Sequence, residues 1–112
     1  MHYEDRSVKD GEQNSRTWSR RLKAAREERG MSQRVLGIAA GIDPSVASTR
    51  VNRYEVGVHA PSYAIASKLA TALDVPVAYL YCDDDGLAQL ILAFHRADAA
   101  AKREIRRKLS LA

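Results

Sequence analysis

Apolar residues recur at helical intervals along most of the chain, and the clearest pattern lies in the stretch that follows Ser32. A helix capped by Ser32 would place on one face Val35, Leu36 and Ala39. Gly41 favours the left-handed backbone that ends a helix and turns the chain sharply. The pattern therefore predicts a short helix followed by a tight turn.

A second helix is expected to begin directly after this turn. Asp43 is a suitable N-cap, and Pro44 suits the first position of a helix. The spacing i, i+4, i+7 predicts a buried stripe of Ala47, Val51 and Tyr54. The opposite face carries small hydrogen-bonding side chains with two arginines beside them: Ser45, Ser48, Thr49, Asn52, Arg53 and Arg50. Such side chains can enter a DNA major groove and contact base edges and phosphates.

The same spacing predicts helices on both sides of this pair. A helix from about residue 17 to 29, with Thr17 as a cap, would bury Trp18, Leu22 and Ala25. A helix from about residue 61 to 73 would bury Ile65, Leu69, Ala72 and Leu73, and a short one would follow from residue 76 to 80. Residues 1 to 16 are polar, mixed in charge and aperiodic, which predicts a disordered tail.

Residues 87 to 109 offer two more helices, or one continuous helix through the alanines at 99 to 101. Asp98 is the expected N-cap if there are two. Their apolar side chains are Leu87, Leu90, Ile91, Phe94, Ile105 and Leu109. These residues either fold back on their own domain or contact a partner. We favour partner contact because the apolar surface is too large to remain exposed.

The order of these motifs resembles the lambda-repressor/Cro type of helix-turn-helix, the Xre-like family. The matching residues within the helix pair are Ser32, Gln33, Leu36, Gly37, Gly41, Ile42, Arg53, Tyr54, Glu55 and Gly57. Those around it are Arg26, Gly30, Pro61, Leu69, Ala70, Leu73, Val75, Pro76 and Leu80. The resemblance covers roughly residues 17 to 81. It implies an all-α fold: a five-helix DNA-binding domain over 17–81, preceded by the 1–16 tail and followed by a C-terminal helical extension over 82–112.

Two positions depart from the family pattern. Gly37 stands where the family usually has alanine, and it still allows the close helix approach needed there. The distance along the chain from Gly41 to Glu55 is longer than in the family by about four residues, close to one helical turn. The additional residues lengthen either the recognition helix or the loop before it.

The resemblance implies roles for Gln33 and for the pair Arg26 and Glu55, and the positions of side chains on the expected helices suggest roles for the others. Gln33 would clamp a DNA phosphate, and Arg34 is a candidate for a second phosphate contact. Base edges would be faced by Ser45, Ser48, Thr49 and Asn52, whereas Arg53 would reach a guanine edge or the backbone. Arg50 leans toward the buried side of the helix and is the weakest candidate. Arg26 and Glu55 match a structural ion pair that ties the first helix to the end of the recognition helix.

Charge is unevenly distributed along the chain. The 112 residues carry a net charge of +4 and an isoelectric point near 9.5, which fits a polyanionic partner without proving one. Arginine and lysine are concentrated in residues 17 to 56 and again in residues 96 to 112. One basic block therefore includes the proposed reading element. The length leaves room for one small domain, without a separate effector-binding domain.

Catalytic, metal and membrane functions find no support in the sequence. The three histidines are scattered at positions 2, 59 and 95, so we expect no enzyme active site. Cys82 is the only cysteine, and the Asp83 to Asp85 triplet lacks calcium-loop spacing, so we expect no disulfide, metal or cofactor. Neither a signal peptide nor a membrane-length apolar run is evident. We expect a cytoplasmic protein.

Two functions from different classes remain open. The first is a sequence-specific transcriptional regulator, expected to be a repressor, that reads the major groove with the helix around residues 44 to 54. It would bind double-stranded operator DNA, expected to be an inverted repeat, as a homodimer. The alternative is an antitoxin-like protein-interaction module, in which the apolar face of residues 87 to 109 pairs with a foreign chain.

Overall fold

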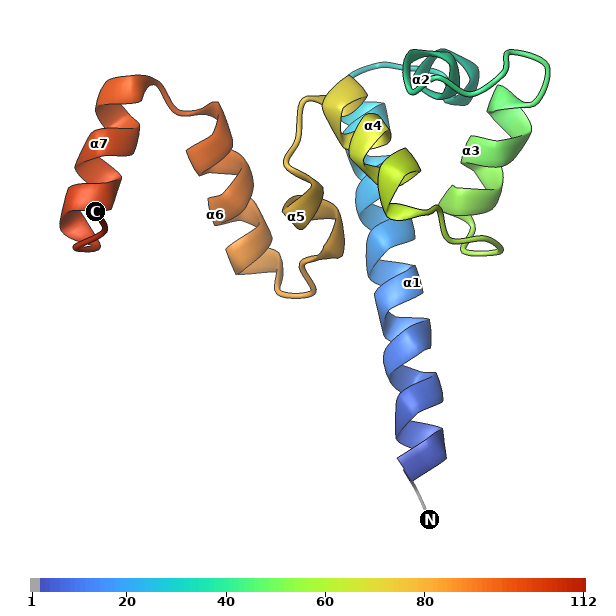
Figure 1. The fold of residues 1–112 in the computed structure, drawn as a ribbon, viewed down its shortest axis with the longest axis horizontal. Helices are drawn as coiled ribbons and strands as arrows, with labels where there is room; N and C mark the ends of the chain where they lie inside the picture. The colour runs from blue at the N-terminus through green and yellow to red at the C-terminus, as the bar shows by residue number, and fades with distance from the viewer. Residues whose placement is uncertain (1–2) are drawn as a thin grey trace.

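The computed structural model describes the backbone of residues 3–112 and the side chains of residues 16–112. The described chain is all-helical (Figure 1). Its seven helices are α1 (Tyr3–Glu28), α2 (Gln33–Ala39), α3 (Ala47–Glu55), α4 (Tyr63–Leu73), α5 (Val77–Tyr81), α6 (Asp85–Arg96) and α7 (Ala99–Lys108). The five-helix domain followed by a helical extension is therefore confirmed. Asp98 accepts a hydrogen bond from the Ala101 backbone N–H at 2.8 Å, and it separates α6 from α7 as two helices.

The core lies among α1 to α5, where the predicted stripes of α1, α3 and α4 meet. Its fully buried side chains include Leu22, Leu36, Val51, Leu69, Leu73 and Leu80. Burying one such leucine contributes about 2 kcal/mol. Trp18 anchors α1 in this core, and its ring meets the Tyr54 ring edge-on with centroids 6.1 Å apart. The predicted faces of α1 and α3 are confirmed, because the 3.6-residue period determines them locally. Helix α4 buries Leu69 and Leu73 as predicted, but Ile65 and Ala72 are only partly buried, and the other buried positions are Ala66 and Ala70.

The N-terminal helix begins earlier than we predicted. We placed its start near Thr17, whereas α1 begins at Tyr3, inside the segment that we expected to be disordered. Residues 1 and 2 of that segment lie outside the described residues. Extending a helix that is already nucleated costs far less than starting one, and the packed part of α1 supplies the nucleus. Thr17 is not a cap, because it is buried within α1.

The buried face of α2 also differs from the prediction. Ser32 caps α2 as expected, since its hydroxyl accepts a hydrogen bond from the Val35 N–H at 3.0 Å. However, Val35 and Ala39 are exposed, and the buried positions are Leu36, Gly37 and Ala40. The inward face carries Gly37 and Ala40 beside Leu36, and the absence of a side chain at Gly37 lets α2 approach α3 closely.

The start of α3 was predicted wrongly. The Asp43 carboxylate accepts hydrogen bonds from the Ser45 N–H at 2.8 Å and from the Ser45 hydroxyl at 2.6 Å, which closes a local turn. The helix begins only at Ala47, and Val46 occupies the N-cap position without a side-chain hydrogen bond. The additional residues between Gly41 and Glu55 therefore lengthen the loop, and α3 remains a short helix.

Helix α6 packs on the domain through a face that the sequence did not single out. Ala88 is fully buried and Leu92 is partly buried against the core. At the start of α6, Thr17 donates to Asp83 at 2.7 Å and Arg21 donates to Asp85 at 2.9 Å. At its end, His95 Nε2 lies 3.1 Å from Asp74 Oδ1, and Arg96 donates to Glu28 at 3.1 Å. Helix α6 is thus fixed to the domain at both ends.

Candidate nucleic-acid interface

The surface that could meet DNA is the outer face of α3. Its inner face is buried in the core through Ala47, Val51 and Tyr54, so the orientation of the helix is fixed. Four of the predicted DNA-contacting residues are exposed on α3: Ser48, Thr49, Asn52 and Arg53. Ser45 is exposed as well, but it precedes the helix and its hydroxyl is bonded to Asp43. The structure therefore brings four of these residues onto one helix and leaves Ser45 in the loop.

Helix α3 begins where α2 comes closest to it. A Cβ atom placed on Gly37 would lie 2.8 Å from the Ala47 Cβ and 3.0 Å from the Ala47 carbonyl oxygen. Real Cβ atoms do not approach other atoms so closely, so only glycine fits at position 37 in this arrangement. This close contact fixes the position of the start of α3 relative to α2.

A network of hydrogen bonds joins the end of α3 to α1 and α2. The Arg26 guanidinium forms a two-pronged ion pair with Glu55, with Nε donating to Oε2 at 2.5 Å and Nη2 donating to Oε1 at 2.9 Å. Its third nitrogen donates to the Met31 carbonyl oxygen at 2.9 Å. The hydrogen bond that Arg26 donates to Glu55 raises the pKa of Arg26 above its ordinary value. This ion pair is the one that the family resemblance implied, and it joins α1 to the end of α3.

Gln33 extends the network to the reading face. Its Nε2 atom donates to Glu55 Oε1 and to Asn52 Oδ1, both at 3.1 Å. Because the Glu55 carboxylate can only accept, the amide nitrogen of Gln33 must point toward it. Both amide hydrogens of Gln33 are then engaged. Gln33 holds Asn52 in place here, and a phosphate contact from this amide requires one of these bonds to open.

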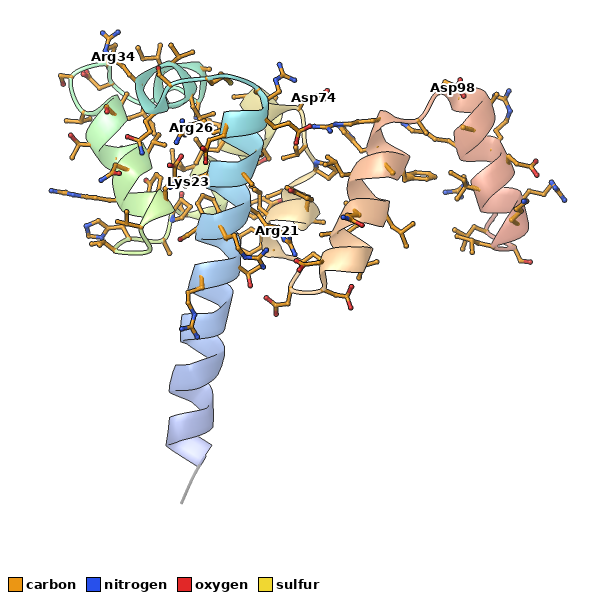
Figure 2. The ribbon with its side chains drawn as sticks, turned by 180° about the vertical axis from the view of Figure 1, so that it is seen from behind. Arg21, Lys23, Arg26, Arg34, Asp74 and Asp98 are labelled. Carbon is orange, nitrogen blue, oxygen red and sulfur yellow. The ribbon has the colours of Figure 1, made fainter. Side chains whose placement is uncertain are left out.

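The other arginines of α2 and α3 lie close to this network. Arg34 is exposed on the outer side of α2 (Figure 2). Arg50 is held in place by a hydrogen bond, which its Nη2 donates to the Tyr54 hydroxyl at 2.8 Å. It is partly buried and lies beside Arg53 and His59. The helical wheel showed that Arg50 leans inward but could not show the buried hydroxyl that receives it.

The six predicted dimerisation residues line one apolar groove between α6 and α7. The groove has a volume of about 650 Å³. Its walls include Leu87, Leu90, Ile91, Phe94, Ile105 and Leu109. Leu90 and Leu109 are about two-thirds exposed, at 67% and 65%. One face of α6 thus packs on the domain while the other borders an open apolar surface.

The described residues form neither a metal site nor a membrane-spanning helix. No three His, Cys, Asp or Glu side chains gather there in a way that could hold a metal ion. None of the described helices is both long enough and apolar enough to cross a membrane.

Two short helices joined by a turn, the second exposing polar side chains and both supported by three further helices, define a helix-turn-helix domain. The helix-turn-helix family model of the Cro/C1 type matches residues 22–80, and the chain belongs to this family. Among solved structures, the chain is similar to the crystal structure of the transcriptional regulator BswR. The two share 43% sequence identity and a TM-score of 0.77, over 82% of this chain and 91% of that one. A search of curated proteins found no match.

Proposed function

We propose that this protein is a DNA-binding transcriptional regulator that recognises an operator sequence by placing α3 in the major groove, and that it acts as a repressor. The observation that carries the proposal is the exposed face of α3, where Asn52 is held by Gln33, which in turn is held by the buried Glu55. A base-reading side chain that is fixed before binding loses less conformational freedom on binding. The similarity to a transcriptional regulator over most of the chain supports the same function.

The experiment that tests this function is selection of bound sequences from random duplex DNA. We expect the selected sequences to share a motif. Replacing Asn52 or Thr49 by alanine should then weaken binding to that motif by about 1–3 kcal/mol while leaving binding to random duplex nearly unchanged. Gln89→Ala, on the exposed side of α6, is the matched control and should change neither. Equal losses on selected and random duplexes for Asn52→Ala would show that Asn52 does not read bases.

Gln33→Ala has a different expected signature. We propose that Gln33 contacts one DNA phosphate and that Arg34 contacts a second. Gln33→Ala and Arg34→Ala should therefore each weaken binding to selected and random duplexes by similar amounts. Because Gln33 also holds Asn52, its replacement should add a smaller loss that is specific to the selected motif. That additional loss should disappear in an Asn52→Ala background. If it persists there, Gln33 does not act through Asn52.

The proposed assembly is a homodimer formed through the groove between α6 and α7, bound to an inverted repeat. A single recognition helix reads only a few base pairs, and two-fold dimers match half-sites about 34 Å apart. Leu90→Glu and Leu109→Glu each place a charge on the open apolar surface and should turn a sedimenting dimer into a monomer. Val58→Glu, equally exposed in the loop after α3, is the control for added charge.

The alternative is that the groove holds a foreign chain, as in an antitoxin-like module. The same apolar surface would suit either partner. A wild-type protein that sediments as a monomer at every concentration, yet keeps its groove exposed, would favour the alternative. A dimer that dissociates only in the Leu90→Glu and Leu109→Glu variants favours the homodimer.

A further inference from the structure

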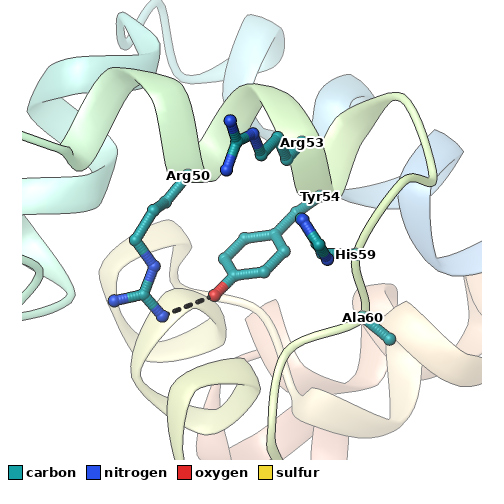
Figure 3. Close-up of a pocket in the computed structure, with 5 residues that line it drawn as sticks. All are labelled: Arg50, Arg53, Tyr54, His59 and Ala60. Carbon is teal, nitrogen blue, oxygen red and sulfur yellow. Dashed lines mark hydrogen bonds between the residues drawn. The ribbon is translucent and has the colours of Figure 1, made fainter.

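A second feature lies beside the reading face, in a hollow at the end of α3. It has a volume of about 340 Å³ and is lined by Arg50, Arg53, Tyr54, His59 and Ala60 (Figure 3). The two arginines come from successive turns of α3, and His59 comes from the loop that leads to α4. None of the five lining residues is acidic. Three nitrogen-bearing side chains therefore converge on one open space from two segments of the chain.

Arg50 is held in this hollow by the protein core. Its Nη2 donates to the Tyr54 hydroxyl at 2.8 Å, and its guanidinium carbon lies 5.9 Å from the centre of the Tyr54 ring. Tyr54 itself is fixed, because only 5% of it is exposed, its ring packs on Trp18, and its carbonyl accepts from Ser19 at 2.7 Å. A guanidinium has five N–H donors, so one bond to Tyr54 leaves four for another acceptor. Arg50 is thus already oriented before any ligand arrives.

The chemistry of the hollow selects a phosphate group. Planar guanidinium groups match phosphate oxygens with paired hydrogen bonds, and an imidazole N–H adds a further donor. The lining has no carboxylate that could bind a cation, and three of its five side chains carry nitrogen atoms. Arg53 is shared with the exposed face of α3, so the hollow is continuous with the residues proposed to face bases.

We propose that this hollow is a binding site for a backbone phosphate of the DNA next to the bases that α3 reads. Arg50, Arg53 and His59 contact the phosphate, and Tyr54 acts as a positioning residue for Arg50. The proposal rests on the proposed function. It adds a phosphate site that includes Arg50, which was the weakest candidate for DNA contact in the sequence analysis. A free phosphorylated compound has the same chemistry, and the experiment distinguishes the two sources.

The first measurement is the salt dependence of DNA binding by the full chain. Each neutralised phosphate contributes about 0.9 to the slope of log K against log salt for duplex DNA. Arg50→Gln should therefore lower this slope by about 1, with similar losses on selected and random duplexes. Arg103→Gln removes a charge from α7, far from α3 (Figure 1), and should leave the slope unchanged. An unchanged slope for Arg50→Gln overturns the proposal.

Tyr54→Phe tests the positioning role. It keeps the ring in the core and removes only the hydroxyl that holds Arg50, so thermal stability should change little while the salt slope falls partway. The effect should vanish in an Arg50→Gln background. A full additional loss in that background would mean that Tyr54 acts on DNA binding by another route, and the positioning role would be wrong.

The source of the phosphate is tested with duplexes that carry a neutral methylphosphonate at single backbone positions. At the position that fills the hollow, wild type should lose affinity and Arg50→Gln should lose no more. A titration with inorganic phosphate at constant ionic strength, followed by NMR of the arginine Nε–H groups, tests the other source. If phosphate binds at Arg50 and no methylphosphonate position couples to it, the site serves a free anion and the DNA assignment is wrong.

These outcomes separate the site from the function. If wild type selects no DNA sequence, the proposed function fails. If wild type binds its selected sequence and Arg50→Gln keeps the full salt slope, only the phosphate site fails.

Discussion

The ion pair between Arg26 and Glu55 permits the sharpest stability prediction. The Glu55 side chain is only 3% exposed, whereas that of Arg26 is 14% exposed. Removing one partner of a buried pair costs about 3–5 kcal/mol, because the remaining charge stays buried without compensation. Arg26→Ala leaves the more buried charge with Gln33 as its remaining side-chain donor, so we expect a loss within that range. Glu55→Ala should cost less, about 2–3 kcal/mol, because Arg26 keeps the Met31 carbonyl and some contact with water.

The two changes should not add. With neither charge present, no uncompensated charge remains, so the double alanine variant should recover about 2 kcal/mol of the summed losses. Urea unfolding followed by circular dichroism gives the four free energies of unfolding that this cycle needs. At this chain length each kcal/mol corresponds to about 4 °C in the melting temperature, so the single variants are readily separated from wild type.

The exposed pair of Arg107 and Glu104, with side chains 70% and 52% exposed, provides the control cycle. Its coupling should be within experimental error, because solvent screens exposed charges. Additive losses for Arg26 and Glu55 would refute the reasoning, as would a larger loss for Glu55→Ala than for Arg26→Ala. DNA binding supplies a second readout, because Glu55→Ala also removes the acceptor that orients Gln33.

Two further predictions concern the approach of α2 to α3 and the attachment of α6. Gly37→Ala should destabilise the fold by about 1–2 kcal/mol and weaken operator binding, because the new Cβ meets the Ala47 Cβ and the Ala47 backbone. Gly86→Ala, where the nearest atom is the Asp84 carboxylate oxygen at 3.3 Å, is the comparison in calorimetry and should destabilise less. The hydrogen bonds from Arg21 and then Arg20 lower the pKa of Asp85 below its ordinary value of 3.8. Its contribution to stability is therefore complete above 3.8 and is lost as pH falls through the lower folded value. The difference in melting temperature between wild type and Asp85→Asn should shrink in that acid range, and a constant difference would contradict the assignment.

Much of the fold followed from the sequence because helical periodicity is a local signal. The stripes through Leu22, Val51 and Leu69 were identified from spacing alone, and Ser32 and Asp98 were identified as caps from residue type. These features depend on neighbours within about one helical turn. The ion pair of Arg26 and Glu55 was accessible only through the resemblance to a family, since no local rule connects the two residues.

The errors share a different cause. At Asp43 the same side chain can cap a helix or close a turn, and its two bonds to Ser45 show that the turn prevailed. On α2, the space beside Ala47 is too small for a side chain, so Gly37 faces inward there. The more apolar Val35 is exposed as a result. In the sequence analysis Asp83 and Asp85 were considered only as calcium ligands, whereas their partners Thr17 and Arg21 lie more than sixty residues away in sequence. Such pairings exist only after the chain has folded.

The attachment of α6 links the proposed dimer surface to the proposed reading surface. One face of α6 carries the buried Ala88 and the other carries Leu87 and Leu90, so the helix can pack on the domain and border the groove at once. Its two ends are tied to α1 and to the C-cap of α4 by polar and charged side chains, which limits how far α6 can tilt. A homodimer formed through that groove would hold the two α3 helices at a defined separation. Weakening the Asp85 attachment should then widen the range of half-site spacings that the dimer tolerates, while leaving the dimer itself and the base contacts of Asn52 intact.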